Sequence, residues 1–172
     1  VNCVSDPRID REFAVASCNV IHDAYELSRQ QKIRVIVDAK KEADVQVNLR
    51  VCSFKEENCN QCEKCFRTMI EIVAEGGNVN DFGFHIEGSF CEALKAFLKN
   101  NVKEIDNDHL VFWKDAIARM SENYNKLLDK DTADFLVTFD FEKEKKHGLW
   151  RYYRQNFFSI VKRKLRSIIR RG

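Results

Sequence analysis

Four of the seven cysteines lie within fourteen residues, in the spacing C-x6-C-x2-C-x2-C. Thiolates two residues apart can bind the same ion, and four thiolates satisfy the tetrahedral coordination that zinc prefers in structural sites. All four histidines lie well away from this cluster in the sequence. Four thiolates leave no open position for water, so the sequence predicts a structural rather than a catalytic zinc, with the ligands Cys52, Cys59, Cys62 and Cys65.

Three other interpretations of the cysteine cluster remain open. A C-x2-C-x2-C run also occurs in ferredoxins, but Phe66, Arg67 and Thr68 stand here where the usual x3-C-P continuation would follow. A redox C-x-x-C pair would use two of the thiols, and unliganded core cysteines would use none. Zinc is favoured because two overlapping pairs and a fourth thiol make a complete ligand set.

The remaining cysteines and the hydropathy of the chain indicate the cellular compartment in which the protein works. Cys3, Cys18 and Cys91 are scattered, and we expect them to be small buried hydrophobic residues. An odd count with one tight cluster suits a reducing environment better than a disulfide framework. No apolar run approaches the roughly 20 residues of a membrane span. The sequence therefore predicts a cytoplasmic protein.

Two elements must position the cluster. Residues 45–51, VQVNLRV, alternate in polarity and predict a short strand that leads into Cys52. Residues 63–75 have apolar side chains at three- and four-residue steps, which predicts a helix that Gly76-Gly77 ends. Zinc would then fix the turn between the strand and the helix.

The rest of the chain predicts a mainly α fold with a few short strands (α+β). Helices are expected over 22–37, 89–99 and 108–128, the last capped by Asp106 or Asn107. Residues 133–141 predict either a strand or the start of a helix, and 142–148 predict a solvated hinge. The core is expected to contain Phe82, Phe84, Phe90, Phe97 and Trp113, with His85 packed beside it.

Charge divides the chain into an α-rich body, 1–148, and a basic amphipathic helix, 149–172. The net charge is +2 and residues 149–172 carry +8, so the body carries −6. Three roles for the basic segment remain open. It could dock on the core, lie on an anionic membrane at the inner face, or contact nucleic acid, which is the least favoured.

The stretch LRVCSFKEENCNQCEKCFRTM resembles the zinc segment of the 7-cyano-7-deazaguanine synthase family, which places an Arg, here Arg67, closely after its cysteines. It is closer to a group of uncharacterised bacterial proteins with an NCGxCEKCxRTM segment. Those proteins carry an upstream hD…sRxxKi segment, here His22-Asp23, Ser28-Arg29 and Lys32-Ile33. Both groups are similar to the N-type ATP pyrophosphatases, or PP-loop enzymes, in which an α/β domain binds ATP and adenylates a carboxylate or carbonyl.

The resemblance covers roughly residues 20–76 and implies the zinc-stapled C-terminal part of an α/β PP-loop protein. The SGGxDS-type phosphate loop of that superfamily is absent, because the only Gly-Gly is Gly76-Gly77 at a helix end. The resemblance therefore implies that ATP is bound by an N-terminal nucleotide domain that precedes Val1. It also implies that Arg29, Lys32 and Arg67 face an anionic cofactor, whereas the residues alone predict a solvated helix face.

Two functions follow from the sequence. The first is a zinc-stabilised domain of an ATP-dependent adenylating enzyme that acts on a small substrate. The alternative is a non-catalytic zinc module that binds a partner, a membrane surface or RNA through its basic segment. No catalytic residue is assigned, because the pair His22-Asp23 is more typical of a helix cap or a surface pair.

Overall fold

The computed structural model describes residues 9, 12, 18, 21, 23–43, 45–53, 55–148, 150 and 154. Helices dominate them, which confirms the predicted mainly α character. Residues 141–148 are helical, and short 3-10 helices lie at η2 (Val79–Phe82), η3 (Val102–Glu104) and η4 (Tyr124–Lys126). The longer helices are α2 (Arg29–Ala43), α3 (Glu63–Ala74), α4 (Phe90–Asn101), α5 (Asn107–Glu122) and α6 (Lys130–Thr138).

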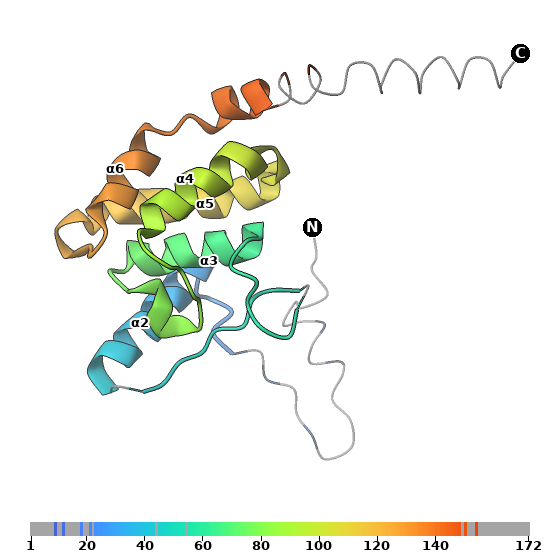
Figure 1. Cartoon of the computed structure of the whole chain (residues 1–172). Helices are drawn as coiled ribbons and strands as arrows, with labels where there is room; N and C mark the ends of the chain where they lie inside the picture. Colours follow the sequence, from blue (N-terminus) through green and yellow to red (C-terminus); the bar gives the residue numbers. More distant parts are fainter. Residues whose placement is uncertain are drawn as a thin grey trace, which may run out of the picture.

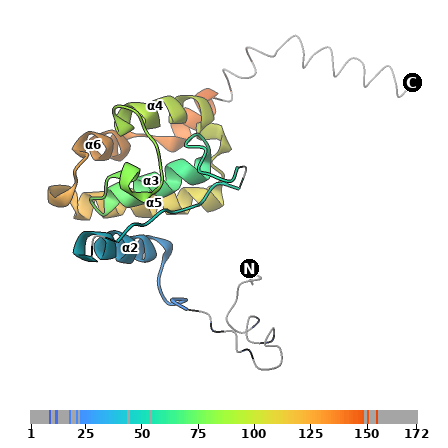
Figure 2. The ribbon, with the colours of Figure 1, turned by 60° about the horizontal axis from the view of Figure 1, so that its bottom comes forward.

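Helix α3 forms the centre of the fold, between α2 on one side and α4 on the other (Figures 1 and 2). Both α2 and α5 pack directly against it. Every residue from Cys65 to Ala74 is buried, including the polar residues Arg67, Thr68 and Glu71. The predicted helix over 63–75 is confirmed. The side of the helix that carries its charged residues, which would normally face water, is covered by neighbouring helices.

Gly76 ends α3 as predicted. Its φ of +69° lies in the left-handed region, where a side chain is disfavoured. The amide of Gly76 donates to Val73 O at 2.8 Å and that of Gly77 to Ile72 O at 3.0 Å, which satisfies the last carbonyls of the helix.

Aromatic side chains join α3, α4 and α5. The rings of Phe66 and Phe97 stack with centroids 4.2 Å apart, and Phe97 lies 6.2 Å from Trp113. Phe82, Phe84 and Phe90 are buried too, so the expected aromatic core is confirmed. His85 is exposed, so its predicted place in the core is wrong: the backbone turns it outward beside buried Phe84.

Caps set the starts of the next helices. Ser89 caps α4, and Asp106 caps α5 by accepting a hydrogen bond from the His109 amide at 2.7 Å. Helix α5 ends at Glu122 and not at 128 as predicted, because Asn123 turns back and donates to Ala74 O at 2.9 Å. Of the two predictions for 133–141, the helical one is right, since α6 covers 130–138.

The strand predicted over 45–51 is absent. Within this fully described stretch the backbone is extended but is not paired with a neighbouring strand. It is joined to another backbone segment by a hydrogen bond from Leu49 N to Phe82 O, at 2.9 Å. The alternation in the sequence still has a physical meaning, because Val47, Leu49 and Val51 pack against the core. An apolar alternation places side chains on one face but cannot supply the neighbouring strand that a sheet needs.

Two further predictions need correction. The helix predicted over 22–37 begins only at Arg29, after a turn in which Ala24 has a φ of 54°, and it continues to Ala43. The hinge predicted over 142–148 is helical, since Asp140 caps it by accepting from Lys143 N at 3.0 Å and its Glu and Lys residues favour helix.

Several predictions fall on the ends of the chain. His22, Cys3 and all of the segment 149–172 except Trp150 and Arg154 lie outside the described residues. Cys91 is buried as expected, whereas Cys18 is exposed. Within the described part of the chain, no helix combines the length and the apolar character that crossing a membrane requires.

Candidate metal centre

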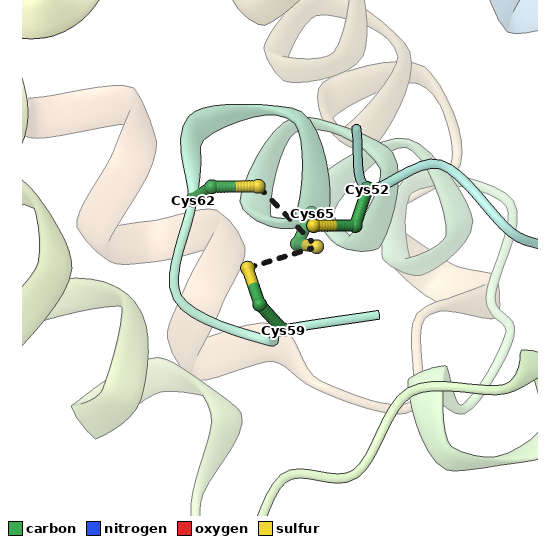
Figure 3. Close-up of side chains that lie close together, drawn as sticks. All are labelled: Cys52, Cys59, Cys62 and Cys65. Carbon is green, nitrogen blue, oxygen red and sulfur yellow. Dashed lines mark hydrogen bonds between the residues drawn. The ribbon is translucent and has the colours of Figure 1, made fainter. Parts of the chain in front are cut away.

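The structure brings together the four cysteines that the spacing singled out. Their sulfur atoms all lie within 4.8 Å of one another and could hold a metal ion. Cys65 Sγ is 3.5 Å from Cys62 Sγ and 3.9 Å from Cys59 Sγ (Figure 3). The side chain of Cys52 reaches the same point from the extended segment before the cluster.

Each sulfur is positioned by a different local feature. Cys62 is the N-cap residue of α3, with an extended backbone, and Cys65 lies in the first turn of that helix. Asn60 has a φ of +56°, a left-handed turn that Asn tolerates better than most residues, and it folds Cys59 back toward Cys62. Cys52 and Cys65 are buried, whereas Cys59 and Cys62 are half-buried.

Asn58 holds the segment that carries Cys52, a role that no sequence pattern indicates. Its Oδ1 accepts from Val51 N at 3.0 Å and from Cys52 N at 3.3 Å. Its Nδ2 donates to Leu49 O at 2.6 Å and to Gly83 O at 2.9 Å. One amide side chain thus ties the arriving segment to the cysteine loop and to the turn after η2.

Burial by itself disfavours charged thiolates in the cluster. Burial raises the pKa of the Cys62 thiol and that of the Cys65 thiol, because it penalises the charged form. A metal ion reverses this preference by stabilising thiolate directly, and the positive end of α3 acts in the same direction.

The residues fit one zinc ion better than a larger cluster. Zinc–sulfur bonds of about 2.3 Å in a tetrahedron place the sulfurs about 3.8 Å apart. The separations of Cys65 Sγ from Cys62 Sγ and from Cys59 Sγ, 3.5 and 3.9 Å, lie on either side of that value. An iron–sulfur cluster has the volume of several atoms and would hold its thiolates farther apart.

Two of the three candidate cofactor residues contact other side chains of the protein. Arg29 Nε donates to Glu71 at 2.6 and 3.0 Å, and its Nη2 donates to Thr68 Oγ1 at 2.8 Å. Arg67 is buried, with Glu63 Oε1 3.5 Å from its Nε and the Phe112 ring 5.0 Å from its Cζ. Lys32 is exposed on α2.

A line of charged residues along α3 is largely buried, which the sequence did not predict. Glu63, Arg67, Glu71 and Glu75 follow one another at four-residue steps, and all but Glu63 are buried. Trp113 Nε1 donates to Glu63 at 2.9 Å, Arg29 pairs with Glu71, and Arg119 pairs with Glu75. These contacts join α2 and α5 to α3, so the charges hold the helices together.

The chain matches no protein-family model, and no curated protein or solved structure is significantly similar to it.

Proposed function

We propose that Cys52, Cys59, Cys62 and Cys65 bind one zinc ion whose role is structural. The observation that carries the proposal is the separation of the four sulfurs, which all lie within 4.8 Å of one another. The ligand set is complete without water, so this zinc activates no nucleophile.

The proposed ion would hold a stretch of the cysteine loop whose polar side chains face water. Ser53, Lys55, Glu56 and Glu57 are exposed, so these four residues contribute almost nothing to the core. The ion would tie this stretch, and the segment 45–51 before it, to the first turn of α3. Such a site couples metal binding to the folding of the loop.

Elemental analysis of the purified chain tests the proposal. We expect about one zinc per chain, because four thiolates complete the shell of one ion. The variant Cys59→Ser should lose most of the metal, whereas the control Cys18→Ser, at an exposed thiol outside the cluster, should retain it. Iron with visible absorbance, or zinc that survives in Cys59→Ser, would contradict the assignment.

A finer proposal concerns the parent activity. We propose that this domain serves an ATP-dependent adenylating enzyme of the PP-loop type, with ATP bound by a polypeptide segment outside this chain. The motif CEKCFRTM supports it, together with one contact: Arg29 of the upstream SRQQK segment donates to Thr68 of that motif at 2.8 Å. The two stretches that carry the resemblance therefore meet in space.

Two measurements test the finer proposal. The reading frame upstream of Val1 should encode an SGGxDS-type loop, whereas a start codon there favours the non-catalytic zinc module. The chain by itself should release no pyrophosphate from ATP with any carboxylate substrate. Pyrophosphate release by the isolated chain would show that the nucleotide site lies within it. Neither result depends on the metal content, so the two proposals can fail separately.

The non-catalytic module remains the second candidate function. The exposure of Trp150 favours it: this residue is helical at the start of the basic segment and 66% exposed. Together with the apolar residues that recur at three- and four-residue steps in the sequence after it, this side chain supports an apolar face that binds a partner.

A further inference from the structure

An apolar groove of about 460 Å³ is lined by residues of α5, of α6 and of the segment that follows α6. We call it the α5–α6 groove. Leu110 and Ile117 of α5 line one wall, and Leu136 of α6, Phe139 and Phe141 line the other. Leu110, Lys114, Ile117 and Ala118 follow the helical spacing of a single face of α5, so the groove runs along a helix.

The rim of the groove leaves apolar surface in water. Val137 lines it and is 59% exposed. A groove with apolar residues on both walls and an exposed valine among its lining residues fits the apolar face of an amphipathic helix.

Residues 149–172, which we call the tail, have the chemistry of such a helix. Arg154 Cζ lies 5.6 Å from the centre of the Trp150 ring, and both residues are helical. The sequence continues with apolar residues at three- and four-residue steps, at Tyr153, Phe157, Val161, Leu165 and Ile168.

Charge favours the pairing of the tail with the groove. Asp140 and Glu142 line the groove beside a single cation, Lys114. The tail carries +8, whereas residues 1–148 carry −6 because the whole chain carries +2. Opposite charges around an apolar contact speed association and fix its orientation.

The tail of the same chain is badly placed to fill its own groove. Phe141 and Glu142 line the groove and begin the helix over 141–148, which leads into the tail over a length of about 12 Å. Trp150 is still helical beyond it and is 66% exposed, so this side chain is not buried against the body of its own chain.

We propose that the α5–α6 groove binds the tail of a second copy of this chain. Reciprocal exchange of the two tails satisfies both grooves and gives a closed two-fold dimer. This contact gives the non-catalytic candidate function a defined partner, but it does not depend on the metal or on ATP.

Sedimentation velocity of the full chain over a wide concentration range tests the proposal. We expect a species of twice the 20.2 kDa chain mass, which raised salt weakens. Val137→Asp should weaken dimerisation at least about tenfold, because it places a charge in the apolar contact. The matched control Val35→Asp, at a residue 56% exposed on α2, should leave the dimer intact. Circular dichroism and zinc content check that each variant is folded.

A mixing experiment identifies the two partners of the contact. Val137→Asp damages the groove and leaves the tail intact, whereas Phe157→Asp does the reverse. Neither variant should dimerise alone, but an equal mixture should form a mixed dimer through the one intact contact.

Other outcomes overturn the proposal. These are a monomer at every concentration, a dimer that Val137→Asp leaves unchanged, and a mixture that stays monomeric. Flotation with phosphatidylcholine–phosphatidylserine vesicles, unaffected by Val137→Asp in a monomeric chain, would assign the tail to a lipid surface instead.

Discussion

Arg119 and Glu75 form a two-pronged ion pair across the contact between α5 and α3. Arg119 Nε lies 2.9 Å from Glu75 Oε1, and its Nη2 lies 3.1 Å from Oε2. Glu75 also accepts from Gln30 Nε2 at 2.9 Å and from Asn123 Nδ2 at 3.2 Å. The buried carboxylate of Glu75 thus links α2, α5 and the turn after α5 to the end of α3.

The first prediction concerns this carboxylate. Glu75→Ala should lower the free energy of unfolding by about 2–4 kcal/mol, because a partly buried guanidinium loses its two-pronged partner and two amides each lose one of their two acceptors. Glu122→Ala is the matched control, since Glu122 Oε2 also pairs with Arg119, at 3.0 Å, but its side chain is 66% exposed. That change should cost less than about 0.5 kcal/mol. Equal losses in urea unfolding would contradict the central role of Glu75.

The second prediction concerns the end of α3. A Cβ on Gly76 would lie 2.6 Å from Lys126 O, and the φ of this glycine is +69°. Gly88 has a similar φ of +73°, but no atom beyond its own chain neighbours lies within 4 Å of a Cβ placed there. Gly88→Ala therefore measures the cost of the left-handed backbone conformation alone, about 1–2 kcal/mol. Gly76→Ala should cost at least about 1 kcal/mol more than Gly88→Ala, because the Lys126 carbonyl must move. Thermal unfolding of both variants measures the difference, and equal melting temperatures would disprove the close contact.

The cysteine cluster was visible in the sequence because its spacing is local. Cys59, Cys62 and Cys65 lie on one turn and the start of one helix, so sequence distance reports spatial distance. The role of Asn58 could not be predicted for the opposite reason: its side chain donates a hydrogen bond to the carbonyl of Gly83, which is 25 residues away. An asparagine in a polar loop has no pattern of its own, and only the folded chain shows what its amide touches.

The charged residues along α3 differ from what their spacing predicts. Charges at four-residue steps normally mark a solvated helix face. On α3 they meet Arg29, Trp113 and Arg119 from neighbouring helices, and those partners are 42 to 50 residues distant. The strand expected over 45–51 failed similarly, since alternation predicts which side chains face the core but not whether a second strand exists.

The third prediction concerns Asn58. Asn58→Ala should lower the free energy of unfolding by about 1–3 kcal/mol, because two amides and two carbonyls lose their partner together. It should also weaken zinc binding about tenfold or more, since Cys52 loses the bond that places its backbone. Competition with a chromogenic zinc chelator measures the affinity, with Asn48→Ala at an exposed position as the control. Unchanged affinity in Asn58→Ala would mean that Cys52 is positioned without it.

The fourth prediction concerns which parts of the fold lose protection from hydrogen exchange when the metal is removed. Chelation should release the amides of Val51 and Cys52 to hydrogen exchange, while those of α3 and α5 stay protected. The reason is that the aromatic contacts among Phe66, Phe97 and Trp113 do not involve the cysteine loop. Cooperative loss of protection across the whole core would show that the ion supports the entire fold. The apoprotein of Cys59→Ser should reproduce the chelated pattern.

The fifth prediction uses the buried carboxylate of Glu71. Burial raises its pKa above the ordinary value of 4.5, and the Arg29 guanidinium opposes that shift only in part. The folded protein therefore holds this proton more tightly than the unfolded chain does. The stability that results is complete below the ordinary pKa and is lost as the pH rises through the folded pKa. Relative to Glu71→Gln, the wild type should become less stable as the pH rises from about 4 to about 7.

Urea unfolding of the two proteins at several pH values measures this difference. Thiol ionisation and metal binding change over the same range, but they are common to both proteins and cancel. Glu87→Gln, at an exposed carboxylate, is the control for removal of a charge without a buried site. A difference that stays constant with pH, or that moves in favour of the wild type as the pH rises, would show that Arg29 outweighs burial at Glu71.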